Sequence, residues 1–440
     1  MIERVFALQA RGTTVAREVR ASLATFLTMA YILVANPAIL TGAGIPFEAA
    51  VAATALTAGL CCLLMGLGAN FPLALAPGMG LNAFVAYQLT PALGSWQAAM
   101  GLVVIDGLVV LALVLLGLRE AVMRAIPLEL RRAIAVGIGL FIAFLGLVNA
   151  RLVVVPASTV AVLGGNPQAT LPPVTHGAFT AAEPLVAIVG VLVTAWLLVR
   201  RVGGAVLIGI GAAALAAFLL GLAVWPASIA GAPRFDTLFQ ADVATASHVR
   251  HLPLLFSIVL VDFFDTIGTV TAVGDAAHLS DAEGRVPRLR RILAIDALSA
   301  TIGGAMGASS ATAYIESSAG VAEGARTGLH TVCVGVLFLL AILLAPLLAM
   351  VPPAAAASAL IVTGFLMCQQ ITRIDFAALE TAIPAFLVIL LVPLTYSISH
   401  GIGAGFVAYV VIRLLNGRWR EIHPLMAASA IAFTIYFAAV

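Results

Sequence analysis

Long apolar runs, separated by short polar or arginine-bearing loops, recur along all 440 residues of the chain. An α-helix needs about 20 apolar residues to cross the hydrocarbon core of a bilayer, and most of the runs approach that length. The pattern therefore predicts a bundle of membrane-spanning helices. We expect about 14 spans, near 21–41, 49–68, 74–90, 97–118, 132–150, 183–200, 203–225, 252–272, 291–307, 309–323, 328–350, 354–371, 380–398 and 400–416. For the remaining apolar stretch, 424–440, the pattern does not decide between crossing and lying on the surface.

Composition and charge agree with a multi-pass membrane protein. Hydrophobic residues make up 62% of the chain and charged residues 10%, and the mean hydropathy is +1.13. A soluble domain of this length has too little interior for so much apolar surface. All 22 basic residues are arginines, and only Arg151, Arg234 and Arg250 fall in loops on the side opposite the N-terminus. Because arginine-rich loops stay in the cytoplasm, we expect the N-terminus (1–20) to be cytoplasmic. We expect the protein to reside in the inner (plasma) membrane of the cell.

Three segments of the first half recur in the same order in the second half. Each half is expected to hold seven spans, and an odd number inverts the second copy relative to the first. An all-α fold of two inverted repeats is typical of secondary transporters. The matched pairs are 71–84 with 307–320, 135–147 with 358–371, and 183–211 with 381–409.

The third and tenth spans contain residues that interrupt a helix. Pro72, Pro77, Gly78 and Gly80 fall in the third, and the tenth is rich in glycine, serine and threonine over 303–320. Irregular backbone at membrane depth is tolerated only where protein buries it or where it lines a watery cavity. We therefore expect short extended stretches there, with half-helix ends that face a ligand.

Acidic side chains in the spans are the strongest candidates for chemistry. A carboxylate at the centre of a membrane helix costs roughly 2.5–3.5 kcal/mol, and no arginine at the centre of a span offsets that cost. Asp262, Asp265, Thr266 and Thr269 share one helical face, which predicts a polar cavity. We expect Asp262 and Glu316 to act in binding and proton coupling, with Asp265 in support. The acidic residues in the spans are Asp106, Asp262, Asp265, Asp296 and Glu316, and we interpret Asp106 and Asp296 as structural.

Nothing in the sequence indicates an enzyme. No nucleophile is paired with a base, the histidines do not cluster, and the four cysteines lack metal-ligand spacing. A nucleotide-binding loop of the GxxxxGK[ST] type is excluded because the chain contains no lysine. We expect no cofactor, no metal and no nucleic-acid partner.

Five stretches resemble signature segments of the AzgA-like purine permeases, a branch of the nucleobase–cation symporter group with the uracil-permease fold. They are TFLTMAYILVANPAIL (25–40), LAPGMGLNAF (75–84), VDFFDTIGT (261–269), YIESSAGVAEGARTGL (314–329) and PLTYSISHGIGAGF (393–406). The resemblance extends over nearly the whole chain. It implies a proton-driven importer of guanine, hypoxanthine or adenine, usually a homodimer.

The resemblance also implies a division into a core and a gate domain that move against each other. The core would comprise 21–118 (spans 1–4) and 251–350 (spans 8–11). The gate would comprise 119–250 (spans 5–7) and 351–440 (spans 12–14 and the C-terminal segment). Asp262 and Glu316 match the purine-binding acids of the family, Asp265 a second acid on span 8, and Gly80 and Asn82 the span-3 signature.

Purine chemistry fits these residue types. A carboxylate accepts two N–H groups from one edge of the base, and charge-assisted hydrogen bonds are stronger than neutral ones. We expect Asn82 to bind a ring nitrogen or carbonyl, Tyr314 or Phe84 to stack on the base, and Thr266 to line the site. A transporter of the same fold for uracil or xanthine, or a passive channel, remains open at this point.

Overall fold

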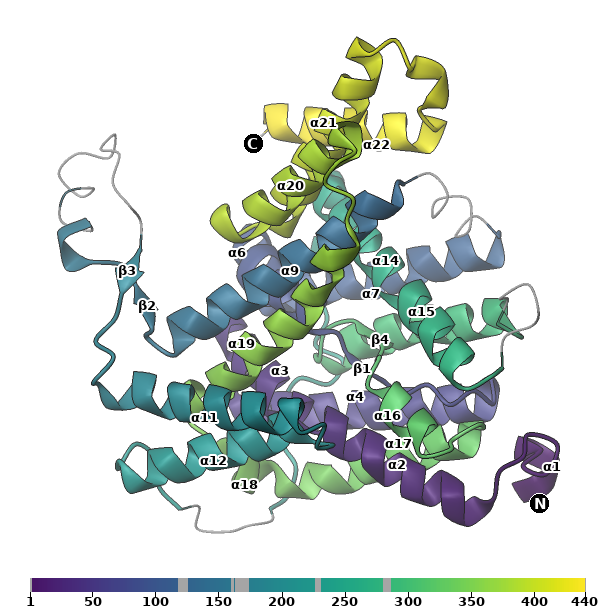
Figure 1. Ribbon diagram of the computed structural model, residues 1–440, viewed down its shortest axis with the longest axis vertical. Coiled ribbons are helices and arrows are strands. Elements are labelled where there is room, and N and C mark those ends of the chain that lie inside the picture. The colour runs from purple at the N-terminus through teal and green to yellow at the C-terminus, as the bar shows by residue number, and fades with distance from the viewer. Residues whose placement is uncertain are drawn as a thin grey trace.

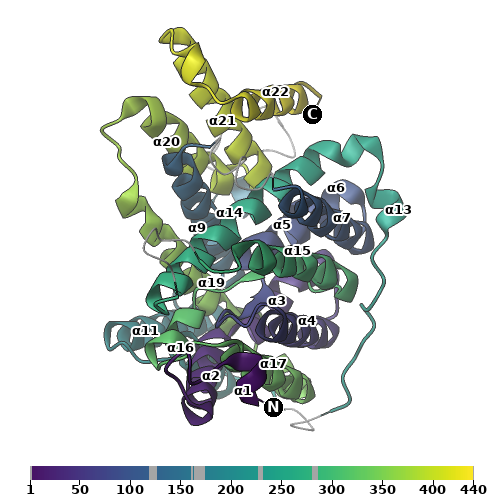
Figure 2. The same ribbon diagram turned by 90° about the vertical axis from the view of Figure 1, so that its right-hand side faces the viewer.

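The computed structural model is a bundle of helices that places the termini at opposite ends of its long axis (Figures 1 and 2). It describes residues 2–117, 126–159, 162, 174–225, 231–279 and 286–439, without the side chains at 263–265, 267, 268, 271 and 439. Within these ranges, eight helical segments are long and apolar enough to cross a membrane, and three further apolar helices are shorter. The chain is thus a helical multi-pass membrane protein, as predicted.

One group of helices fills the right of Figure 1 and extends left of its centre at α3 and α18. Within it, α4 packs on α3, α15 and α17, while α2 packs on α16 and α17, and α7 on α13 and α15. The N-terminal helix α1 (Ile2–Phe6) precedes this group. Its other members are α2 (Val15–Met29), α3 (Ile32–Leu40), α4 (Phe47–Gly68), α7 (Trp96–Leu115), α13 (Val243–Ala246), α15 (Leu289–Met306), α16 (Ser317–Ala322), α17 (Gly328–Ala341) and α18 (Ala345–Ala349).

A second group lies to the left and top of the same view. Here α9 packs on α19, α20 and α21, and α11 packs on α12 and α19. Large apolar side chains on its outer faces are exposed, among them Leu192 and Leu215, as expected for surfaces that face lipid. The members are α9 (Leu128–Asn149), α11 (Ala182–Val199), α12 (Ala205–Leu219), α19 (Pro353–Cys368), α20 (Leu379–Leu394) and α21 (Ile398–Leu415).

The two interrupted spans meet in the middle of the molecule, where Figure 1 places β1 and β4. β1 (Leu75–Pro77) and β4 (Ala311–Ala313) are fully buried and pair antiparallel, with Ala76 opposite Thr312. After β1 the chain forms α5 (Met79–Phe84), a π-helical turn (Val85–Leu89) and α6 (Thr90–Leu93). After β4 it forms α16. The predicted extended stretches in spans 3 and 10 are therefore confirmed.

Three features go beyond the predicted spans: the start of the first span, the C-terminal segment and a small pair of strands. The first span begins at Val15 rather than 21, because the Thr14 side chain accepts a hydrogen bond from the Arg17 N–H and caps α2. The segment near 424–440 forms α22 (Pro424–Ala439), which packs on α21. A small hairpin of β2 (Val153–Val154) and β3 (Thr175–His176) projects at the left of Figure 1.

Candidate functional site

The paired strands satisfy the backbone that a broken helix leaves exposed. The Gly78 N–H donates to the Ser310 carbonyl at 2.9 Å, and the Tyr314 N–H donates to the Ala74 carbonyl at 3.0 Å. The Ser317 hydroxyl oxygen accepts from the Ala74 N–H at 2.9 Å. Since unpaired N–H and C=O groups are costly in a membrane interior, this pairing is what allows two extended segments at that depth.

Glu316 lies at the break, directly before α16. Its carboxylate accepts a hydrogen bond from the Tyr31 hydroxyl at 2.9 Å. Tyr31 is buried where α2 gives way to α3, and the Thr363 hydroxyl of α19 lies near it. Glu316 itself is only half-buried. The predicted acid is thus held by a neutral donor rather than by a basic side chain.

Helix α14 (Leu252–Ala276) carries the other predicted acids past the break, in contact with β4, α16 and α5. Asp262 is buried, with an exposed fraction of 1%. The side chain of Asp265 falls outside the described residues. Asp262 therefore lies on the helix that packs against both interrupted spans, as the motif order indicates.

The Thr266 hydroxyl contacts polar side chains of two other elements. Its hydroxyl donates to the Asp296 carboxylate of α15 at 2.6 Å and lies 3.1 Å from the Thr312 hydroxyl of β4. All three side chains are buried. This arrangement joins α14 to β4, and it gives Asp296 the structural contact that the sequence predicts.

The span-3 residues occupy three different environments. Asn82 is fully buried, its amide nitrogen donates to the Pro77 carbonyl at 3.4 Å, and its Oδ1 has no hydrogen-bond partner among the described residues. Gly80 faces α9, where an added Cβ would lie 2.6 Å from the Ile138 side chain. Phe84 is one of the largest fully buried side chains. In this conformation, only Asn82 of the three presents a polar atom without a partner.

Tyr314 closes the strand pair from the other half of the chain. Its hydroxyl donates to the Pro77 carbonyl at 2.6 Å, so Asn82 and Tyr314 share that acceptor. The ring is buried against the core. Two predicted binding residues from spans 3 and 10 are therefore brought together by the β1–β4 crossing.

Sequence reasoning did not single out Tyr31, although it lies in the first signature stretch. It also did not single out the contact of His330 with Thr25, whose hydroxyl lies 2.8 Å from the His330 Nε2 beneath α16. A tyrosine or histidine in an apolar run has many structural uses, so neither residue had a distinguishing signal. No cluster of metal-binding side chains occurs in the part of the chain that the structure describes.

Several known proteins have amino-acid sequences similar to that of this chain. Residues 16–404 match a family profile described as "Permease family". The chain is 40% identical to the adenine permease AdeP of Escherichia coli K12, over 99% of this chain and 95% of that one. It is also 40% identical to the guanine/hypoxanthine permease PbuG of Bacillus subtilis 168, over 97% of each chain.

Solved structures with the same fold come from more distant proteins. The transmembrane domain of the cyanobacterial bicarbonate transporter BicA has a TM-score of 0.63 and 18% identity, with coverage of 88% of this chain and 97% of that one. SLC26A9 has a TM-score of 0.62 and 11% identity, with coverage of 91% of this chain and 65% of that one. At these identities the similarity shows the arrangement of helices alone.

Proposed function

The chain belongs to this permease family and is a membrane transporter rather than an enzyme, and from that premise we propose that it imports purine nucleobases with protons. The substrates would be guanine, hypoxanthine or adenine. The observation that carries the proposal is the position of the Glu316 carboxylate. It lies at the break between β4 and α16, where the two interrupted spans pair and where α14, the helix that carries Asp262, packs against both elements.

The proposed binding chemistry follows from the donors and acceptors around the break. Glu316 accepts from Tyr31, and none of the described basic residues forms an ion pair with it, so the carboxylate can turn to N–H groups on a purine edge. The partnerless Oδ1 of Asn82 can accept one further N–H from the base. The other predicted residues would shape the site, and not all of them would touch the base; they are Gly80, Thr266, Phe84 and Tyr314.

We assign proton coupling to the same acids. A carboxyl group kept from water can bind and release a proton with little rearrangement, and Glu316, Asp262 and Asp265 are the candidates. A proton taken up from outside would favour purine binding, and movement of the site would release both inside. The proton gradient is then the only energy source required.

The two groups of packed helices support the core and gate domains that we propose, although α13, which falls in the gate range, packs on α7 of the core. Residues 21–118 and 251–350 would form the core, and 119–250 and 351–440 the gate, related by an inverted repeat. Contacts of α14 with α9 and α21, and of α5 with α9, lie between the groups. Sliding of the core past the gate would give alternating access. The arginine distribution supports a cytoplasmic N-terminus in the inner membrane, and we propose a homodimer.

The test is uptake of labelled hypoxanthine by cells that lack their own nucleobase permeases, with and without a protonophore. Unlabelled guanine, adenine, xanthine and uracil are the competitors. We expect uptake that collapses with the protonophore and is blocked by guanine or adenine. Competition from uracil or xanthine alone would refute the purine assignment, and uptake insensitive to the protonophore would indicate a passive facilitator or channel.

Matched variants test the site. We expect Glu316→Gln and Asp262→Asn to lower uptake at least tenfold, because an amide oxygen binds two N–H groups more weakly and cannot carry the proton. Glu323→Gln is the control, since Glu323 lies just beyond α16 and its exposed side chain forms a surface ion pair with Arg20. Wild-type uptake by Asp262→Asn, or equal losses in Glu316→Gln and Glu323→Gln, would refute the assignment.

A further inference from the structure

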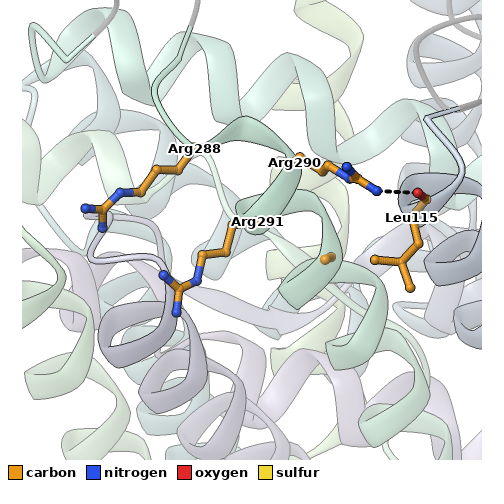
Figure 3. Close-up of a pocket in the computed structure, with 5 residues that line it drawn as sticks. Leu115, Arg288, Arg290 and Arg291 are labelled. Carbon is orange, nitrogen blue, oxygen red and sulfur yellow. Dashed lines mark hydrogen bonds between the residues drawn. The ribbon is translucent and has the colours of Figure 1, made fainter.

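Three arginines surround a pocket where α7 ends and α15 begins (Figure 3). The pocket has a volume of about 540 Å³ and is lined by Leu115, Arg288, Arg290, Arg291 and Ala294. Arg288 and Arg291 extend to one side of the start of α15, and Arg290 reaches toward Leu115. The transport site that we propose does not use any of these residues.

The positive charge of this pocket is not neutralised by the described part of the protein. Arg290 donates to the Leu115 carbonyl and so caps the end of α7. The side chains of Arg288 and Arg291 are exposed and form no hydrogen bond or ion pair with any described residue. The first turn of α15, an 18-residue helix, adds the positive end of its dipole. An anion bound here would be stabilised by two free guanidinium groups.

Another positive charge, that of Arg11, interacts with this cluster. Burial, and next the charge of Arg288, lower the pKa of Arg11, which is outside the spans. The Arg11 guanidinium donates to the carbonyls of Asn70 and Arg326 instead of to a carboxylate. Arg11 and Arg288 repel each other, and the Glu18 carboxylate offsets only part of the effect on Arg11. An excess of positive charge is typical of a surface that binds an anionic partner.

The apolar wall of the pocket favours an anion that also carries an apolar chain. Leu115 is 54% exposed and Leu116 is 70% exposed, so apolar surface lies directly beside the arginines. Leu115 is also the last residue of an apolar helix long enough to span the membrane, which puts the pocket at the boundary between hydrocarbon and headgroups. An amphiphile with a phosphate and an acyl chain matches both surfaces, whereas a free phosphate uses only the arginines.

We propose that Arg288 and Arg291 bind the phosphate of an anionic phospholipid whose acyl chain lies against Leu115. Basic pockets beside membrane helices recognise such headgroups, and each arginine near the surface contributes about fivefold in affinity. Loss of both arginines is therefore expected to weaken binding roughly 25-fold. The lipid would hold the start of α15 at the membrane surface.

The test is a titration of the purified full chain in detergent with phosphatidylglycerol or phosphatidylcholine. Bound lipid is counted by native mass spectrometry, and the shift in melting temperature is taken relative to each variant without lipid. We expect phosphatidylglycerol to bind the wild type and raise its melting temperature, and phosphatidylcholine to do neither. Arg288→Gln/Arg291→Gln is expected to abolish the shift.

Arg200→Gln/Arg201→Gln is the matched control. It removes the same charge from the end of α11, and Arg201 shares the left-handed backbone of Arg288, with φ values of 56° and 57°. We expect this control variant to keep the lipid response. Arg288→Lys/Arg291→Lys should keep it as well, because lysine retains the positive charge, and it serves as a check that substitution at these two positions does not itself prevent folding. Equal losses in both glutamine variants, or displacement of the lipid by inorganic phosphate alone at equal concentration, would overturn the proposal.

Discussion

Replacing Gly320 with alanine is expected to force α16 away from the helices beneath it. An added Cβ would lie 2.4 Å from both the Thr25 Oγ1 and the His330 Nε2, and 2.7 Å from the Ala21 carbonyl oxygen. Non-bonded heavy atoms prefer about 3.5–4.0 Å, so relief requires a movement of about 1 Å. Because the Ala21 oxygen is backbone and His330 is fully buried, α16 must itself shift.

The magnitude follows from two contributions. Overpacking a filled interior costs about 1–3 kcal/mol. The shift also strains the hydrogen bond from the Gly320 N–H to the Thr25 hydroxyl at 3.1 Å, and that between Thr25 and His330 at 2.8 Å, each worth about 1 kcal/mol. The helix propensity of alanine returns up to about 1 kcal/mol. We therefore expect the free energy of unfolding to fall by about 2–4 kcal/mol.

Thermal unfolding of the purified chain in detergent, measured together with purine uptake, checks this prediction. Uptake should fall as well, because α16 directly follows Glu316 and a shift displaces its carboxylate. Gly211→Ala is the control, since an added Cβ on that residue of α12 meets nothing within 4 Å. It should leave stability equal or slightly higher. An unchanged melting temperature and normal uptake for Gly320→Ala would refute the packing that we describe.

Three further outcomes are expected. Glu18→Ala should lower stability by about 2–3 kcal/mol in the same melt, because the buried carboxylate accepts two backbone N–H groups at the start of α17. Thr266→Val should leave the Asp296 carboxylate short of a donor and cost about 1–3 kcal/mol, with reduced uptake; wild-type values would contradict this. Hydrogen bonds from Thr245 lower the pKa of Asp242 from its ordinary value of 3.8. The charged carboxylate therefore caps α13 above pH 3.8, and the cap is lost as the pH falls through the lowered pKa of the folded protein. Hydrogen exchange of α13 should then quicken only in acid, and not in Asp242→Asn, which lacks the charge.

Local features of the sequence were sufficient for the class of protein and much of the site. Hydropathy reports whether a segment lies in lipid or in water, and Pro77 followed by Gly78 disfavours a continuous helix at that point of the chain. The membrane bundle, the interruptions in spans 3 and 10, and the burial of Asp262 beside them were therefore predictable. The signature stretches added the family.

Only the tertiary structure decided which of these residues meet. Tyr31 and Glu316 are separated by 285 residues, and Thr266 and Asp296 by 30, yet each pair forms a hydrogen bond. A one-dimensional pattern shows the face on which a side chain lies but not the partner on the facing helix. The β1–β4 crossing makes that choice, since a shift of one residue in its register would turn Thr312 away from Thr266.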